Sequence, residues 1–441
     1  MTKHVAPSPL SQKKIAVIGA GIAGHGAAWA LSKASNVILY EKESQFGGHA
    51  HTVDVDCGEY SVPVDMGFIV YNQLNYPNLT ALFDHLGVAT ETSNMSFAVS
   101  LDGGRYEYHG SGLAGVFAQK RNMLSPRHIH MLRQVVRFYK SVPHLAREID
   151  LTKITLGQWL DAMSMGRWFR ERHIIPMAAC IWSASANEIL DFPAAAFVRF
   201  FENHGLLKLK DRPQWRTVSG GSRAYVAALH KDMRAVKRAS CPVTAVARVE
   251  GGVKVITEQG EALYDEVVIA AHADDAYAML ANPTAQERSV LPAFRYSDNE
   301  VVLHTDERVM PKRRHVWSSW NYVAPSTVDP DRPVPLSYWM NRLQNLPANQ
   351  DVFVTLNPID DIDPSTIRKT VNFQHPIFDA QTYAAQPKLD ALQGDSGIWY
   401  AGSYFAYGFH EDALASGLNV ARALGVDMPW DEHPADVVAA E

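Results

Sequence analysis

Cysteine is scarce, basic residues are not in excess, and no hydrophobic run is long, so several classes of protein are excluded. The 441 residues include three cysteines, Cys57, Cys180 and Cys241, which are far apart and odd in number. They suggest neither a disulfide framework nor a zinc site. A net charge of −6 gives no global attraction to nucleic acid. The uncharged stretch at residues 174–187 is too short to span a bilayer.

The composition is that of a globular protein with a substantial core. Hydrophobic residues make up 47% of the chain and charged residues 20%, as in ordinary globular domains. A chain of 441 residues is longer than one typical domain, so we expect two domains. Residues 1–12 are polar, contain proline and lack an apolar signal core. We therefore expect a flexible leader and a cytoplasmic location.

The first distinctive motif is a glycine-rich turn between a predicted strand and a predicted helix. Residues 14–18 read Lys-Ile-Ala-Val-Ile, and residues 19–24 read Gly-Ala-Gly-Ile-Ala-Gly. In this pattern Gly19 allows the tight turn, Gly21 lets the backbone approach a pyrophosphate, and Gly24 lets the helix pack closely on the strand. The motif therefore predicts a dinucleotide-binding site.

The surroundings of the turn support the same prediction. The helix begins with amides, including those of Ile22 and Ala23, on which a diphosphate can lie because the helix dipole favours anions there. A second predicted strand, residues 36–40, ends at Glu41. An acid about 20 residues after the turn typically binds the adenosine ribose hydroxyls. Its carboxylate would repel a 2′-phosphate, which argues against NADP.

The rest of the chain alternates between strand-rich and helix-rich stretches. Strand and helix patterns alternate up to about residue 86, as at the start of a doubly wound sheet. The pattern is helical and aromatic from about 110 to 209, and strand signals return between 242 and 271. We predict an α/β fold: a doubly wound (Rossmann-like) nucleotide domain formed by 13–86, 212–295 and 395–441, and a discontinuous α+β substrate domain formed by 87–211 and 296–394.

These motifs, in this order, resemble the flavin-containing amine oxidase and phytoene desaturase superfamily over nearly the whole chain. After the acid of the second strand and a short loop come Gly47, Gly48 and His49, where the family has a Gly-Gly pair near the flavin. The segment 400–403, Tyr-Ala-Gly-Ser, resembles the family's terminal segment beside the ribityl chain and isoalloxazine ring. The resemblance implies an amine-oxidase-like architecture with FAD as the cofactor.

The resemblance also implies which residues contact FAD. In chain order they are Gly19, Gly21, Ile22, Ala23, Gly24, Glu41, Lys42, Gly47, Gly48, His49, Val243, Ala270, Gly402, Ser403, Phe409, His410 and Ala413. Two of these positions depart from the family pattern. His49 replaces the usual arginine after the glycine pair, and Ser403 replaces the acid that often follows the last glycine. Both departures weaken a transfer of amine-oxidase chemistry without abolishing FAD binding.

Within the superfamily, three motifs resemble bacterial flavoproteins associated with fatty-acid modification. They are residues 319–322, 336–344 and 408–412. The resemblance implies an enzyme that acts on unsaturated or methylated acyl chains, by desaturation or by moving a double bond.

The function expected from these motifs is FAD-dependent removal of hydride from a C–H bond of an apolar substrate, with a fatty-acyl chain favoured. The candidate catalytic residues are His49, Tyr322 and Tyr404 as base or orienting groups, and Trp339 as part of the substrate wall. Three alternatives stay open: an amine oxidase, a carotenoid or other isoprenoid desaturase or isomerase, and a non-enzymatic flavin-binding protein.

Two further patterns bear on partners. The segment 119–147 carries seven Lys or Arg residues and no Asp or Glu, with apolar residues at helical spacing between them. This is typical of a basic amphipathic helix on an anionic lipid surface, and equally of an ordinary solvated helix face.

The alternating histidines of His49-Ala50-His51 and His128-Ile129-His130 lack further ligands nearby, so we expect no metal. We place His128 and His130 at the surface.

Overall fold

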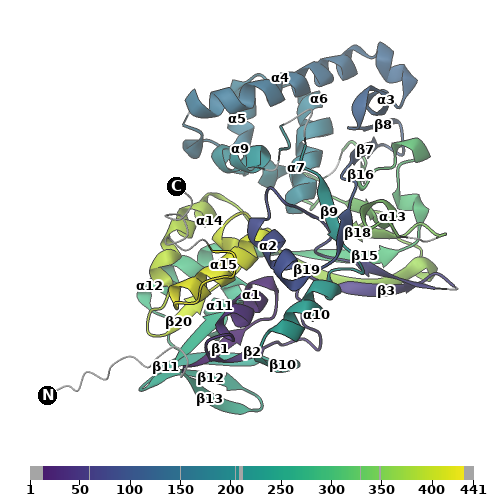
Figure 1. Ribbon diagram of the computed structural model, residues 1–441. Coiled ribbons are helices and arrows are strands. Elements are labelled where there is room, and N and C mark those ends of the chain that lie inside the picture. Colours follow the sequence, from purple (N-terminus) through teal and green to yellow (C-terminus); the bar gives the residue numbers. More distant parts are fainter. Residues whose placement is uncertain are drawn as a thin grey trace, which may run out of the picture.

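The computed structural model describes residues 13–58, 60–148, 150–203, 205–207, 212–327, 329–346 and 349–431. The predicted leader, residues 1–12, and the last residues of the predicted nucleotide domain, 432–441, lie outside this part. The fold contains two main sheets and a layer of helices (Figure 1).

The first main sheet is parallel and gathers strands from three distant parts of the chain. Its spatial order is β10 (Val236–Arg238), β2 (Asn36–Tyr40), β1 (Lys14–Ile18), β14 (Glu266–Ile269) and β20 (Ile398–Tyr400). In β1, residues 15–17 are completely buried. A central parallel strand is covered on both faces, which explains its continuous apolar sequence. The strands fall within the segments predicted for the nucleotide domain, while the exact domain boundaries stay a prediction.

Two helices cross closely beside this sheet, α1 (Ile22–Leu31) and α15 (His410–Ala423). A Cβ at Gly417 would lie 2.1 Å from the carbonyl oxygen of Ala23, so only glycine permits the contact. This packing fixes the middle of α15 against the first turns of α1. The other elements around this sheet are α2 (Pro77–Leu86), α10 (Arg223–Asp232), β11 (Val243–Val249), β12 (Gly252–Thr257), β13 (Gly260–Tyr264), α11 (Ala273–Met279) and α12 (Ala285–Val290).

The second main sheet is mostly antiparallel, with β16 and β7 as a parallel pair. Its order is β19 (Ile367–Ile377), β15 (Arg295–His304), β18 (Phe353–Leu356), β17 (Leu336–Trp339), β16 (Trp320–Ala324), β7 (Phe97–Leu101) and β8 (Tyr106–His109). Smaller elements nearby are β3 (Thr52–Asp56), β4 (Ser61–Asp65), β5 (Tyr71–Asn72), β6 (Thr90–Thr92), β9 (Trp215–Val218), α13 (Met340–Leu343) and α14 (Ala380–Ala385).

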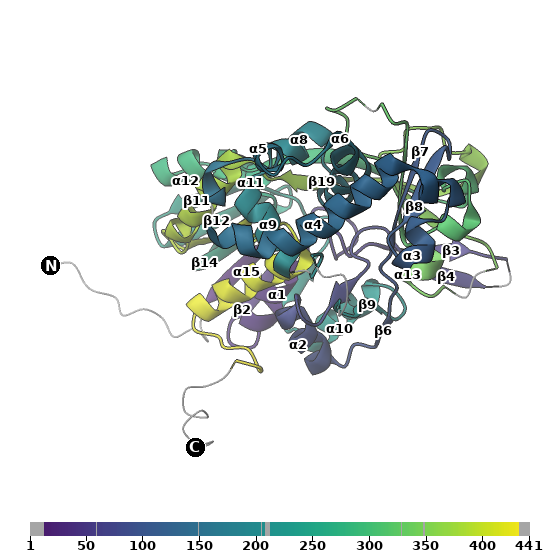
Figure 2. The ribbon, with the colours of Figure 1, turned by 90° about the horizontal axis from the view of Figure 1, so that it is seen from above.

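A helical layer covers this second sheet. It contains α3 (Gly112–Val116), α4 (Pro126–Glu148), α5 (Leu156–Ala162), α6 (Arg167–Phe169), α7 (Ile175–Trp182), α8 (Ala186–Asp191) and α9 (Ala194–Asn203). Their aromatic side chains form the core of the layer: Phe138, Trp159 and Phe169 are completely buried. The long helix α4 crosses the outside of the layer, and α3 lies near its first residues (Figures 1 and 2).

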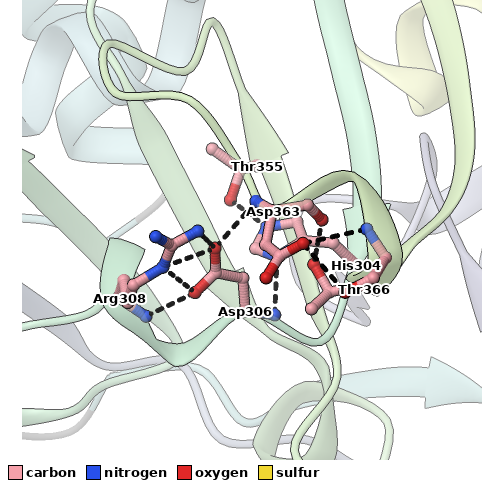
Figure 3. A network of polar contacts seen from close by, with 7 residues as sticks. His304, Asp306, Arg308, Thr355, Asp363 and Thr366 are labelled. Carbon is pink, nitrogen blue, oxygen red and sulfur yellow. Dashed lines mark hydrogen bonds and ion pairs between the residues drawn. The ribbon is translucent and has the colours of Figure 1, made fainter.

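A polar network closes one end of the second sheet (Figure 3). The carboxylate of Asp306 accepts hydrogen bonds from the side chain of Arg308 and from the amide of Asp363 at 3.0 Å. His304 accepts a bond from the Asp306 amide at Nδ1, 3.1 Å, so its Nε2 donates to the hydroxyl of Thr355 at 2.8 Å. Burial lowers the pKa of His304 to about 4, which keeps the imidazole neutral.

Candidate active site

A cavity of about 2310 Å³ is lined by both main sheets and by the helical layer. Pockets for a single drug-sized ligand usually measure about 300–1,000 Å³. The cavity therefore has room for a dinucleotide together with a second molecule.

The glycine-rich turn after β1 forms one end of this cavity, and its three glycines have different requirements. Gly19 has a φ of +95°, and a Cβ there would lie 2.6 Å from the carbonyl oxygen of Ala270. A Cβ at Gly24 would lie 1.8 Å from the carbonyl oxygen of Gly19. A Cβ at Gly21, in contrast, meets no atom within 4 Å and faces the cavity. The fold itself requires Gly19 and Gly24, whereas the space at Gly21 fits a ligand pyrophosphate.

The acid after β2 lies directly beside this turn. One carboxylate oxygen of Glu41 accepts from the amide of Ala20 at 2.8 Å, and the other accepts from the amide of Glu43 at 2.9 Å. Glu41 is buried at the cavity wall. A carboxylate has about four acceptor positions, so the group is held rigidly and still has lone pairs for ribose hydroxyls.

The second glycine pair packs on the first. The amide of Gly47 donates to the carbonyl of Ala20 at 2.9 Å. Gly48 has a φ of +57°, and a Cβ there would lie 3.0 Å from the Cα of Gly21. The pair therefore brings the next residue, His49, to the cavity wall.

The terminal segment reaches the same cavity through the start of α15. The amide of Gly402 donates to the hydroxyl of Ser416 at 2.8 Å, which in turn donates to the carbonyl of Ala413 at 2.7 Å. Asp412 accepts from the amide of Phe409 at 2.9 Å and caps the helix. These bonds hold the loop and helix start in one arrangement at the cavity wall.

Four buried or half-buried histidines surround this part of the wall. Burial lowers the pKa of His49 well below its usual value, and His375, His272 and His410 lower it further. Burial also lowers the pKa of His375 to about 4 and that of His410 to about 3. The cluster is therefore uncharged at neutral pH. The Nε2 atom of His49 and the hydroxyl of Tyr404 are buried and, among the described residues, have no hydrogen-bond partner.

The opposite end of the cavity, which we call the helical arm, is lined by apolar side chains. Its residues are Leu113, Val116, Leu132, Val135, Val136, Tyr139, Met177, Ile181, Trp182, Phe200 and Leu206. The hydroxyl of Tyr139 bonds to Nε2 of His173 at 3.0 Å, and burial lowers the pKa of that histidine to about 4. Arg212 also lines the cavity near this arm.

Most of the residues predicted from the sequence line this single cavity. They are Gly19, Gly21, Ile22, Ala23, Glu41, Lys42, Gly48, His49, Val243, Ala270, Gly402, Ser403, Tyr404, Phe409, His410 and Ala413. Gly24 and Gly47 do not line it; they permit close backbone contacts behind it. The convergence of these distant segments is a geometric result, and their individual contacts with a cofactor stay predictions.

Two predicted catalytic residues lie outside the cavity wall. Side chains alternate along a strand, so in β17 Tyr338 lines the cavity while Trp339 points the other way. There the indole of Trp339 donates to Asp351 at 2.8 Å and packs edge-on against Trp317. Tyr322 is buried in the core under the helical layer. Neither residue has the position expected for contact with a substrate.

Three wall residues, Tyr338, Phe373 and His375, were missed by the sequence analysis. Tyr338 contacts Trp320 edge-to-face at 4.9 Å on the cavity wall. Phe373 and His375 extend from β19 onto His49, with ring centroids 4.8 and 5.6 Å away. Val371, Phe373 and His375 alternate along β19, which predicts that they share one face of the strand. The sequence does not predict that this face packs beside the glycine pair, because that contact depends on the tertiary fold.

The comparisons identify the family. The family model of flavin-containing amine oxidoreductases matches residues 22–352. The chain therefore belongs to this family of flavin-containing oxidoreductases, and its cofactor is FAD, as the resemblance implied.

Three individual proteins show how similar this chain is to known relatives. AofH of Mycobacterium tuberculosis, a candidate flavin-containing monoamine oxidase, is 27% identical over 268 residues, or 58% of this chain and 56% of AofH. A CLA-producing fatty acid isomerase from P. acnes is 15% identical with a TM-score of 0.67, covering 94% of this chain and 99% of that one. A putrescine oxidase is 17% identical with a TM-score of 0.69, covering 94% and 98%. At such identities the solved structures share the fold, and they confirm the predicted amine-oxidase-like α/β architecture.

Proposed function

We propose that the substrate is the acyl chain of an unsaturated or methylated lipid, held in the helical arm of the cavity. The supporting observation is the character of the wall. None of the lining residues between 110 and 206 is Asp, Glu, Lys or Arg, and the pKa of His173 is lowered to about 4. Apart from the exposed Arg212, which lines the cavity near this arm and helps to lower the pKa of His173, the wall is uncharged and apolar, so it accommodates a hydrocarbon chain.

The reaction proposed is oxidation of one C–H bond in that chain. Bound FAD supplies a two-electron acceptor. Loss of a hydride from one carbon and a proton from its neighbour would form one C=C bond, with oxygen or an electron carrier reoxidising the cofactor. Moving an existing double bond would need no net oxidant.

The protein's own contribution in this proposal is position. The walls of the helical arm would hold the chain in a near-attack geometry, which is a large part of catalytic power in such sites. His49 and Tyr404 both line the cavity. The unpartnered Nε2 of His49 would accept a proton from the reacting group, and the unpartnered hydroxyl of Tyr404, which stays neutral because burial raises its pKa, would orient that group as a hydrogen-bond donor. Because burial lowers the pKa of His49, it would act as a neutral imidazole.

A second candidate is oxidation of an amine. It is favoured by the similarity to AofH and by the edge-to-face pair of Trp320 and Tyr338 at the wall, since aromatic faces attract ammonium groups. The similarity to the P. acnes fatty acid isomerase favours the acyl chain instead.

The test is product analysis on lipids. The purified FAD-loaded protein is incubated aerobically with a total lipid extract, and heat-inactivated protein is the control. We expect acyl chains that have lost two hydrogen atoms, or have a shifted double bond, by mass spectrometry with double-bond localisation. Unchanged acyl chains together with peroxide release from amines would overturn the proposal and favour the second candidate.

A further inference from the structure

The long helix α4 has one buried face and one cationic face. His128, Met131 and Phe138 are completely buried against the helical layer. The exposed residues repeat on the other side at helical spacing. They are Arg127, His130, Arg133, Val136, Arg137 and Lys140.

The charge on this surface is of one sign. No Asp or Glu occurs from residue 108 to residue 147. Within the described residues, Lys120, Arg133 and Lys140 form no ion pair with a carboxylate, and the ion pairs between residues 150 and 172 involve Lys153, Arg167, Arg170 and Arg172 instead. The exposed cations are therefore not neutralised by the protein.

Apolar side chains project beside these cations. In the part of the chain that the structure describes, eight large hydrophobic residues are exposed, and four of them lie between 113 and 136. Leu124 is 87% exposed, Leu113 79% and Met123 52%. They lie in α3 and in the short 3-10 turn (Lys120–Leu124) that leads into α4. A mixture of unpaired cations and projecting apolar groups is typical of a surface that enters the headgroup region of a bilayer.

The cavity reaches the outside at the same surface. Leu113 and Val136 both line the helical arm and are both exposed. A chain entering between α3 and α4 would therefore pass from the surroundings of Leu113 directly into the arm. Figure 2 shows α4 lying across the outer face of the molecule with α3 near one end. In the described residues no helix is long and apolar enough to cross a membrane, so this contact would be peripheral.

We infer that the surface formed by α3, the turn at 120–124 and the exposed face of α4 docks on an anionic lipid bilayer. We call it the docking surface. Charge complementarity selects the bilayer as its occupant, because each cation near an anionic membrane surface strengthens binding. The apolar residues enter the headgroup region, and the helical arm opens toward the acyl chains. This last step rests on the proposed function, whereas the docking itself does not.

Vesicle flotation tests the docking directly. FAD-loaded protein is mixed with vesicles of phosphatidylcholine alone or of phosphatidylcholine with phosphatidylglycerol. We expect flotation with the anionic vesicles only, and its loss at high salt. Equal binding to both vesicles, or none to either, overturns the inference.

Two variants locate the surface. Lys120→Glu with Lys140→Glu reverses two exposed cations, and Leu124→Asp removes the most exposed apolar group. We expect at least an approximately tenfold fall in vesicle affinity for each. The matched controls are Lys231→Glu with Lys388→Glu, and Leu263→Asp, which change the same charge and apolarity at exposed positions elsewhere. Controls that lose binding as strongly as the variants would contradict the location.

The readouts separate this inference from the proposed function. Flavin content and melting temperature show that each variant is folded, and flotation involves no turnover. Docking without lipid oxidation would leave the surface standing and overturn the acyl-chain proposal. Lipid oxidation in detergent without flotation would support the acyl-chain proposal and overturn the docking surface.

Discussion

At the end of the cavity near β1 the wall is mainly backbone, whereas at the helical arm it is mainly side chain. Gly19, Gly21 and Gly48 form the first end, where an added Cβ either meets backbone or projects into the space for the cofactor. Leu132 and Val135 represent the second end, where bulk and apolarity define the wall. The first end recognises a ligand through amides and one carboxylate, and the second through shape and the absence of charge. Mutations at the first end should therefore reduce FAD binding, whereas mutations at the helical arm should reduce the reaction with the substrate.

The largest effect is expected at the backbone end. Gly21→Val adds branched carbon atoms where the fold leaves open space, so the protein should fold but lose the pyrophosphate position. We expect flavin content below about a tenth of wild type, measured by absorbance after gel filtration, with an unchanged far-UV spectrum. Gly110→Ala, at the other end of the cavity, is the control and should stay fully loaded. A Gly21→Val protein that is yellow, and therefore still binds FAD, would contradict the placement of the pyrophosphate at this turn.

The next effect concerns the acid beside the turn. Glu41→Gln keeps one acceptor oxygen but removes the charge that strengthens bonds to ribose hydroxyls. A hydrogen bond to a charged group contributes about 1.5–3 kcal/mol, so FAD affinity should fall about 10- to 100-fold. Titration of the apoprotein with FAD measures this change. An unchanged FAD affinity would mean that Glu41 accepts hydrogen bonds only from the amides of Ala20 and Glu43 and does not bind the ribose.

A smaller and more selective effect is expected in the helical arm. Leu132→Trp fills part of the arm without touching the glycine turn. FAD content should be unchanged, while the rate of flavin reduction by a long acyl chain should fall about tenfold relative to a short one. The exposed Leu263→Trp is the control. Equal losses with long and short chains would show that the arm does not hold the chain.

The smallest effect compares two histidines whose pKa values are lowered alike in different surroundings, the half-buried His375 on the cavity wall and the completely buried His304. Burial lowers the pKa of both His375 and His304 to about 4, against about 6.5 in an unfolded chain. Each contributes stability that is present above pH 6.5 and lost as the pH falls toward 4. Replacing either by Gln should reduce the pH dependence of unfolding in this window by about 1.4 kcal/mol per pH unit.

Only one of these histidines should affect the flavin. His375 lines the cavity beside His49, whereas His304 belongs to the network at the end of the second sheet (Figure 3). We therefore expect His375→Gln to shift the visible flavin spectrum and His304→Gln to leave it unchanged. Identical spectra for both variants would place the histidine cluster away from the cofactor.

The backbone end was predictable from the sequence because its requirements are local. Gly19, Gly24 and Glu41 occur at fixed spacings, and β1 and β2 begin and end at the predicted residues. Such features depend on turns and helix starts, which the sequence specifies within a few residues.

The side-chain end was predicted less well because its residues meet only through tertiary packing. Tyr338 rather than Trp339 faces the cavity, a difference of one residue that reverses the face of a strand. The surface position expected for His128 is wrong: it is completely buried and bonds to the hydroxyl of Tyr106 at 2.8 Å. The basic segment is not one helix from 119 onward, since α4 begins at Pro126 after a separate 3-10 turn.

The most direct test of the central claim is anaerobic reduction of the bound flavin. The FAD-loaded protein is mixed without oxygen with a dispersed unsaturated phospholipid, and separately with a panel of primary amines, while the visible absorbance is followed. The account predicts bleaching with the lipid and recovery of the yellow colour when oxygen or an electron acceptor is added. Bleaching by amines with none by any lipid would contradict it.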